Sequence, residues 1–234
     1  MRASDAWLVY GSRQAQDVVE LGADRERVVV APITPLVPEA PARDRAPTAG
    51  TTRYLFVGRL IERKGLDVLL EAFSGVDGGE LRIAGDGPLR ATVEAAAARD
   101  PRIHLIGHVT GQTLARAYRE ADVLVVPSLY EPWGLVVHEG LAAGLPVIAT
   151  DQVGAAEDLI ERDVNGYVVA AGSAEELRAA MSVIGRWTPE RHEEGSRRSA
   201  ERLASFSVEH GAEGFVRGCA LALEHRKRTT SLTA

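Results

Sequence analysis

The sequence predicts an α/β fold in which a parallel β-sheet carries helices on both faces. Short apolar runs recur along the chain, and each is about as long as one strand. The runs are continuously apolar instead of alternating, which is typical of parallel strands buried on both faces. Helical patterns separate them, and this strand–helix alternation favours right-handed crossovers within one sheet.

Each expected element follows from its own stretch of sequence. In the first expected helix, Leu66, Leu69, Leu70 and Phe73 lie on one helical stripe that can face a core. The strands are expected at 54–57, 81–84, 103–106, 122–126, 146–150 and 167–170, and the helices at 65–74, 88–98, 111–120, 134–144, 155–161 and 173–185.

The two ends of the chain differ from this body. Residues 6–31 have the pattern of one more strand–helix–strand unit, and five prolines follow between 32 and 50. That proline density prevents regular structure and indicates a linker. Two further helical stretches are expected, at about 189–205 and 207–226. The expected division is an N-terminal segment 1–37, a linker 38–53, a sheet domain 54–188 and C-terminal helices 189–234.

Composition excludes several classes of protein. The 234 residues are 45% hydrophobic and 26% charged, so the chain is not disordered throughout. No apolar run reaches the roughly 18 residues of a membrane span, and the first residues lack the pattern of a signal peptide. The single cysteine, Cys219, excludes an intrachain disulfide and a Cys-rich zinc site, and we expect it in the core. The net charge of −6 argues against nucleic acid as a partner. We expect a cytoplasmic protein.

The first candidate site is FVGRLIERKG, residues 56–65. An expected strand ends at Gly58, and Arg59 and Lys64 follow before a helix begins. Ligands of parallel sheets bind beyond the carboxyl ends of the strands, where two cations suit a phosphate or diphosphate. The alternative is that both are ordinary solvated cations.

A second motif, GDGPLR at 85–90, is weaker. Its sixth position is Arg90 instead of glycine, so the dinucleotide-binding fingerprint is incomplete. A tight strand-to-helix turn explains it better than a phosphate cradle.

The third and strongest feature lies between residues 128 and 160. Glu131 precedes an expected helix, Gly134 and Leu135 begin it, and Glu139 lies in its early turns. Free backbone N–H groups at the helix start attract anions, and carboxylates accept hydrogen bonds from sugar hydroxyls. The alternative is a capping loop before a helix with one exposed glutamate. No H-E-x-x-H zinc motif is present, because Leu141 and Ala142 follow Gly140.

Taken in order, these motifs resemble the C-terminal, donor-binding half of GT-B glycosyltransferases, specifically the retaining family 4. The resemblance covers about Val57 to Val169. It rests on GRL, RKG, GDGP, IGHV, ADVLVVPS, EPWGLVVHEGLAAGLPVIAT and NGYVV. It implies a Rossmann-like domain that is one half of a GT-B fold.

The resemblance also implies roles for single residues. Arg59 and Lys64 match the basic pair that grips the donor diphosphate, Glu131 the glutamate beside the transferred sugar, and Glu139 the one that holds the ribose. The implied donor-binding set is Gly58, Arg59, Lys64, His108, Val109, Glu131, Gly134, Leu135 and Glu139, of which Glu131, Arg59 and Lys64 form the catalytic set. No metal or other cofactor is expected, and the co-substrate would be a UDP- or GDP-sugar.

The function that this implies is a retaining hexosyltransferase acting on a sugar, a lipid-linked or a small-molecule acceptor. Residues 1–37 match only the end of the family's N-terminal acceptor domain, so we expect the activity to need that domain, a partner protein that carries it, or a second copy of the chain. The alternative is a non-catalytic nucleotide-sugar-binding subunit of a split glycosyltransferase. A sugar-nucleotide epimerase is disfavoured by the paired glutamates, and a phosphorylase by the lack of a pyridoxal-phosphate lysine context.

The basic run 225–228 can contact the inner face of a membrane, although a solvated helix end explains it more simply.

Overall fold

The computed structural model describes residues 4–35 and 51–232, and the side chains up to Lys227. The chain divides into two compact units. The larger is Pro35–Leu203, and the smaller combines Met1–Thr34 with Ala204–Ala234. Most of the expected linker, residues 38–50, lies outside the described residues.

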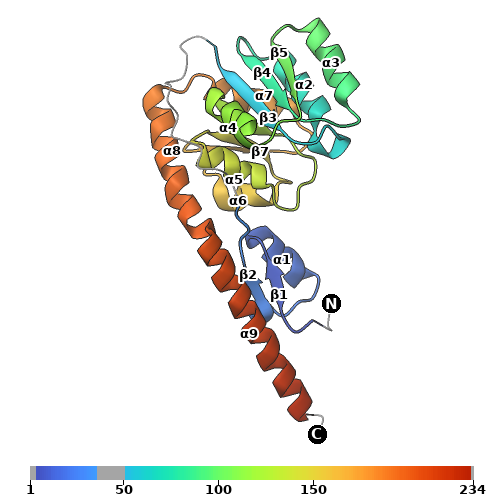
Figure 1. The fold of residues 1–234 in the computed structure, drawn as a ribbon, viewed down its shortest axis with the longest axis vertical. Helices are drawn as coiled ribbons and strands as arrows, with labels where there is room; N and C mark the ends of the chain where they lie inside the picture. The colour runs from blue at the N-terminus through green and yellow to red at the C-terminus, as the bar shows by residue number, and fades with distance from the viewer. Residues whose placement is uncertain (1–3, 36–50, 233–234) are drawn as a thin grey trace. The chain divides into compact units, whose positions relative to one another are not determined.

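The larger unit contains a six-stranded parallel sheet with the order β5-β4-β3-β6-β7-β8 (Figure 1). The expected α/β fold with a parallel sheet is confirmed, because six apolar runs became these six strands. Their bounds are β3 Arg53–Val57, β4 Glu80–Ala84, β5 Ile103–Gly107, β6 Val123–Val126, β7 Val147–Thr150 and β8 Gly166–Val169.

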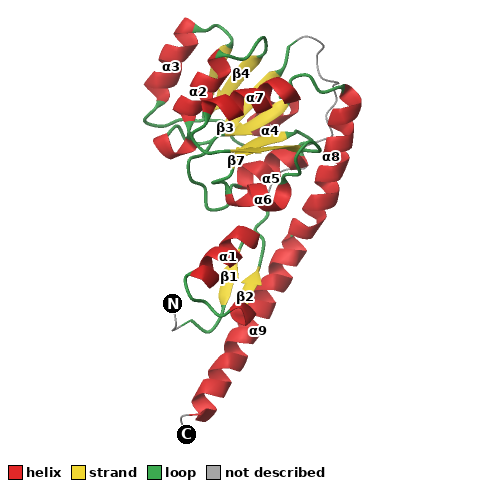
Figure 2. Ribbon diagram, turned by 180° about the vertical axis from the view of Figure 1, so that it is seen from behind, coloured by secondary structure: helices red, strands yellow, loops and turns green. Residues whose placement is uncertain are grey.

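Helices connect and cover these strands (Figure 2). The strand order reverses between β3 and β6, so right-handed crossovers put the connecting helices of the two halves on opposite faces. A reversal of this kind is where open α/β sheets bind ligands. The bounds are η2 Glu62–Lys64, α2 Leu66–Ser74, α3 Arg90–Arg99, α4 Gly111–Glu120, α5 Leu135–Ala142, α6 Gly154–Leu159, α7 Ala174–Ile184 and α8 Pro189–Leu203.

The core of this unit forms around the central strands. Every residue of β6 and β7 is buried, and each fully buried aliphatic side chain contributes roughly 1.5–3 kcal/mol relative to exposure. At the amino ends of β3 and β6, Arg53 and Asp122 form a buried two-pronged ion pair at 2.9 and 3.0 Å. The same carboxylate accepts from the Arg53 backbone N–H at 2.8 Å. This pair fixes the two strands at the end opposite to their carboxyl termini.

The smaller unit is built on the expected strand–helix–strand. Its strands β1 Trp7–Val9 and β2 Val28–Val30 pair in parallel. The chain between them forms α1 Ser12–Glu20 and η1 Arg25–Arg27. The turn η3 Ala204–Phe206 and the helix α9 Val208–Leu232 complete it. A Cβ added at Gly214 would lie 2.6 Å from the Val30 carbonyl oxygen, so this glycine lets the helix backbone approach β2 closely.

Two expectations about the C-terminal region need correction. The segment 189–234 does not stay together, because α8 belongs to the larger unit and α9 to the smaller one. Cys219 is exposed instead of buried. The reason is that α9 packs through its glycine face, which includes Gly214 and Gly218, and so turns Cys219 and Val216 outward.

Candidate functional site

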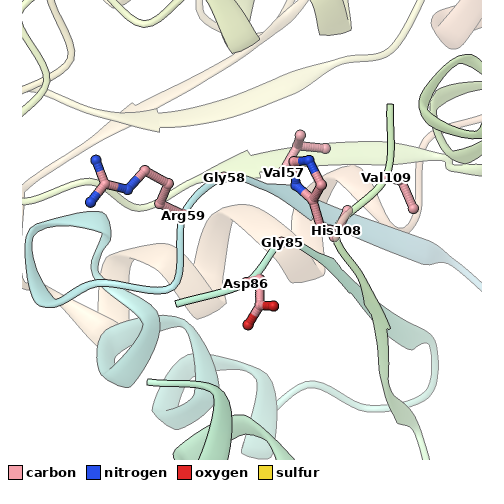
Figure 3. A pocket seen from close by; sticks show the side chains of 8 residues that line it. Val57, Gly58, Arg59, Gly85, Asp86, His108 and Val109 are labelled. Carbon is pink, nitrogen blue, oxygen red and sulfur yellow. The ribbon is translucent and has the colours of Figure 1, made fainter. Parts of the chain in front are cut away.

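A pocket of about 240 Å³ opens at the carboxyl ends of β3, β4 and β5 (Figure 3). Four of the expected donor-binding residues, Gly58, Arg59, His108 and Val109, line it. The remaining lining residues are Val57, Ala84, Gly85 and Asp86.

The GDGP turn shapes this pocket through close backbone contact. A Cβ at Gly85 would lie 1.9 Å from the Gly58 carbonyl oxygen, and one at Gly87 would lie 2.6 Å from that of Leu60. The Leu60 N–H donates to the Asp86 carbonyl at 2.9 Å. The motif therefore forms a tight turn that packs against the loop after β3, which agrees with its interpretation from sequence.

The Arg59 guanidinium is a positive charge that a ligand can reach. Its side chain is exposed, and within residues 4–35 and 51–227 it makes no ion pair. Figure 3 shows its guanidinium directed away from Asp86 and His108. An exposed guanidinium presents planar donors that match phosphate oxygens.

Lys64 and Glu131 lie together as an ion pair, with side chains that are 15% and 14% exposed. Lys64 ends η2, and Glu131 lies in the loop after β6. A Cβ on Gly65, whose φ is +68°, would lie 2.0 Å from the Pro127 carbonyl oxygen, and the Leu129 N–H donates to the Arg63 carbonyl at 2.8 Å. The adjacent placement of β3 and β6 thus brings the two residues into contact.

The loop from Glu131 to Gly134 is held against the loop that follows β7. The Glu131 N–H donates to the Gln152 carbonyl, and the Gly154 N–H donates to the Glu131 carbonyl, both at 3.0 Å. Gly134 has a φ of +96° and precedes α5 without a side-chain cap. The backbone N–H groups at Gly134, Leu135 and Val136 therefore have no partner within the helix. They form a positively polarised end that favours an anion.

Glu139 lies one turn into α5 and is half-buried. Its Oε2 accepts a hydrogen bond from the Tyr118 hydroxyl at 2.6 Å. Burial, reinforced by the Glu139 charge, raises the pKa of Tyr118 far above its ordinary value. This tyrosine was not among the residues expected at the site. The available signal was a tyrosine on the buried side of helix 111–120, because a buried hydroxyl needs a partner.

His138 is next to Glu139 but differs from it in burial. Its side chain is 6% exposed, and its Nδ1 has no hydrogen-bond partner in the described part of the chain. Burial lowers the pKa of His138.

The described residues contain no group of three or more His, Cys, Asp or Glu side chains that could hold a metal ion. No described helix is long and apolar enough to cross a membrane.

This architecture is shared with glycosyltransferases of the GT-B class. The structure of HepE from Anabaena in complex with UDP superposes with a TM-score of 0.77 over 92% of this chain and 64% of that one, at 17% identity. Such a distant likeness shows the fold. The Rossmann-like fold expected for one half of a GT-B enzyme is confirmed.

The family follows from sequence. Residues 51–184 match the family described as glycosyl transferases group 1, and the chain belongs to it. An uncharacterised glycosyltransferase of Methanocaldococcus jannaschii is 39% identical over 49% of this chain and 31% of its own length. A D-inositol 3-phosphate glycosyltransferase of Nocardia farcinica is 30% identical over 94% of this chain and 53% of its own length. The chain thus spans about a third to a half of these relatives.

Proposed function

We propose that this chain binds a nucleotide-activated sugar and is the donor-binding part of a retaining glycosyltransferase of family 4. The observation that carries the proposal is the grouping of charges where the strand order reverses. Arg59 and Lys64 follow β3, whereas Glu131 and the uncapped start of α5 follow β6. The UDP bound by HepE supports a nucleotide donor.

The diphosphate is assigned to Arg59, Lys64 and the N–H groups at Gly134 and Leu135. These groups supply fixed positive charge where negative charge develops on the leaving diphosphate. They take the place that a metal ion holds in other phosphate sites, so no cofactor enters the proposal. Because Lys64 is paired with Glu131, binding exchanges one carboxylate partner for phosphate oxygens. The exchange frees Glu131 to face the transferred hexose.

The nucleoside is assigned to the pocket and to Glu139. Val109 and His108 line the pocket and offer an apolar surface and an imidazole to the base. Glu139 accepts hydrogen bonds from the ribose hydroxyls. The acceptor would be a polyhydroxylated small molecule, sugar or lipid-linked compound, which the inositol phosphate in the name of the Nocardia relative supports. Its binding domain, in the same chain or in a partner, and the cytoplasmic location remain predictions.

Calorimetric titration of the chain with UDP, GDP, UMP, GMP, UDP-glucose, UDP-N-acetylglucosamine and GDP-mannose tests the donor assignment. We expect saturable binding of one nucleoside diphosphate and its sugar, with the matching monophosphate much weaker. Absence of binding to every member of the panel by folded protein would overturn the assignment. Retention is tested separately, by NMR of the anomeric proton in the first transfer or donor-hydrolysis product.

A further inference from the structure

The hydrogen bond between Tyr118 and Glu139 joins a fully buried hydroxyl to a half-buried carboxylate. Tyr118 belongs to α4, and its side chain is 1% exposed. Glu139 belongs to α5, and the strand β6 separates the two residues in the sequence. Their O···O distance of 2.6 Å is that of a strong bond between a hydroxyl and a carboxylate.

The direction of this bond is fixed. A carboxylate accepts and does not donate, so the tyrosine hydroxyl must be the donor. Because burial and the Glu139 charge both raise the pKa of Tyr118, the phenol keeps its proton throughout the working pH range. Tyr118 therefore behaves as a permanent donor to Glu139 Oε2.

The carboxylate keeps capacity for a ligand. An ionised carboxylate offers about four acceptor positions, and this tyrosine is the one side-chain partner that Glu139 has among the described residues. A carboxylate fixed at one oxygen loses rotational freedom about its terminal torsion, which is broad in a free glutamate. The oxygen Oε1 and the remaining lone pair of Oε2 then point in defined directions.

We infer that Tyr118 is a positioning residue for recognition of the ribose. Its hydroxyl holds the Glu139 carboxylate so that the free acceptor positions meet two neighbouring ribose hydroxyls at once. The inference rests on the proposed function, because it takes Glu139 as the ribose-binding residue. It goes further by assigning discrimination of ribose from deoxyribose to a residue that cannot touch the ligand.

Tyr118→Phe tests this inference, since it removes the hydroxyl and keeps the ring. A matched control is Tyr54→Phe. Tyr54 is equally buried, at 2% exposed, and its hydroxyl donates to the Met181 carbonyl at 2.9 Å, away from the residues of the site. Both variants lose a buried hydroxyl, and both are expected to lose some thermal stability.

The measurement is calorimetric affinity for UDP and GDP and for their 2′,3′-dideoxy analogues. We expect Tyr118→Phe to weaken binding of the ribonucleotide by about two- to twelvefold, since hydrogen bonds contribute roughly 0.5–1.5 kcal/mol. Its affinity for the dideoxy analogue should stay unchanged. Tyr54→Phe should keep the wild-type ratio of the two affinities. In a Glu139→Ala background, adding Tyr118→Phe should leave the ratio unchanged, because no carboxylate is left to position.

The outcomes separate the inference from the function on which it rests. Wild-type protein that binds neither UDP nor GDP overturns both. Wild-type protein that prefers the ribonucleotide, together with a Tyr118→Phe variant that keeps the same preference, overturns only the positioning role. Equal losses for ribo and dideoxy ligands in Tyr118→Phe would also overturn it, because they would show a merely structural effect.

Discussion

Lys64 and Glu131 lie 67 residues apart in the sequence, yet they form an ion pair in which each side chain is only about 15% exposed. The pair spans the junction of β3 and β6, one partner following each strand. Removing one member of a largely buried pair leaves the other charge uncompensated. Glu131 therefore provides the counter-charge for the lysine that we assign to the diphosphate.

Glu131→Gln should tighten the binding of free UDP or GDP while it impairs sugar transfer. The phosphate no longer has to displace a carboxylate from Lys64. Exposed pairs contribute up to about 1 kcal/mol and this pair is largely buried, so we expect a gain of at least about fivefold. Calorimetry with the free nucleotide measures the gain. Weaker binding of the free nucleotide by folded Glu131→Gln would contradict the competition.

Glu139→Gln should act in the opposite direction on the same ligand. The amide keeps the shape of the side chain, and its oxygen can still accept from Tyr118, so the fold should persist. One charged acceptor for the ribose is lost, and we expect affinity for UDP or GDP to fall by roughly tenfold or more. If Glu131→Gln and Glu139→Gln change this affinity identically, the separate roles of the two glutamates are wrong.

Replacing Arg59 and Lys64 together with alanine should weaken nucleoside diphosphate binding by about 3–6 kcal/mol, because hydrogen bonds to charged groups contribute roughly 1.5–3 kcal/mol each. The matched control replaces Arg197 and Arg198, two α8 arginines whose side chains are 60% and 42% exposed. The control changes the net charge equally and should bind as wild type does. Equal affinities of the two folded double variants would exclude the diphosphate assignment.

Gly65→Ala should destabilise the chain by more than about 3 kcal/mol. An L-residue in the left-handed region costs roughly 1–2 kcal/mol, and here the new Cβ would also lie 2.0 Å from the Pro127 carbonyl oxygen. Gly172→Ala is the control, because Gly172 has a φ of +80° with open space around it. Urea unfolding should separate the two variants clearly. Equal losses would mean that the close approach at Pro127 relaxes freely.

Stability should fall between pH 7 and pH 5 partly through His138. Burial lowers the pKa of His138 in the folded chain, whereas an unfolded histidine has a pKa of about 6.5. Below that pH the unfolded state binds a proton that the folded state does not, so the free energy of unfolding drops as the pH falls toward the folded pKa. The contribution is fully present above the unfolded pKa.

His138→Leu should flatten this part of the pH dependence, as measured by urea unfolding at pH 7.5 and 5.5. Replacement of the exposed His104 by glutamine provides the control and should leave it unchanged. A pH dependence of His138→Leu identical to that of wild type would show that another group is responsible.

The sequence predicts the elements of this chain better than their contacts. Helix 111–120 was expected with the bounds that α4 has, because local periodicity decides where an amphipathic helix forms. The pairing of Lys64 with Glu131 depends instead on β3 lying beside β6, and no local pattern states that order. Tyr118 was missed for the same reason, since its partner lies on another helix. Cys219 was placed wrongly because an apolar stretch does not show which helix face the glycines use for packing.

The pairing of β3 with β6 has fewer registered residue pairs than any other strand pairing in this sheet. It is registered over Tyr54–Val123 and Leu55–Leu124, whereas β3 and β4 are registered over five residue pairs. The Arg53–Asp122 ion pair connects the two strands at their amino ends, and the Lys64–Glu131 ion pair connects the loops that follow their carboxyl ends. An ion pair therefore holds each end of the pairing between β3 and β6. The register that places Lys64 next to Glu131 thus depends on a buried arginine at the opposite end of the same strand as well as on two backbone pairs.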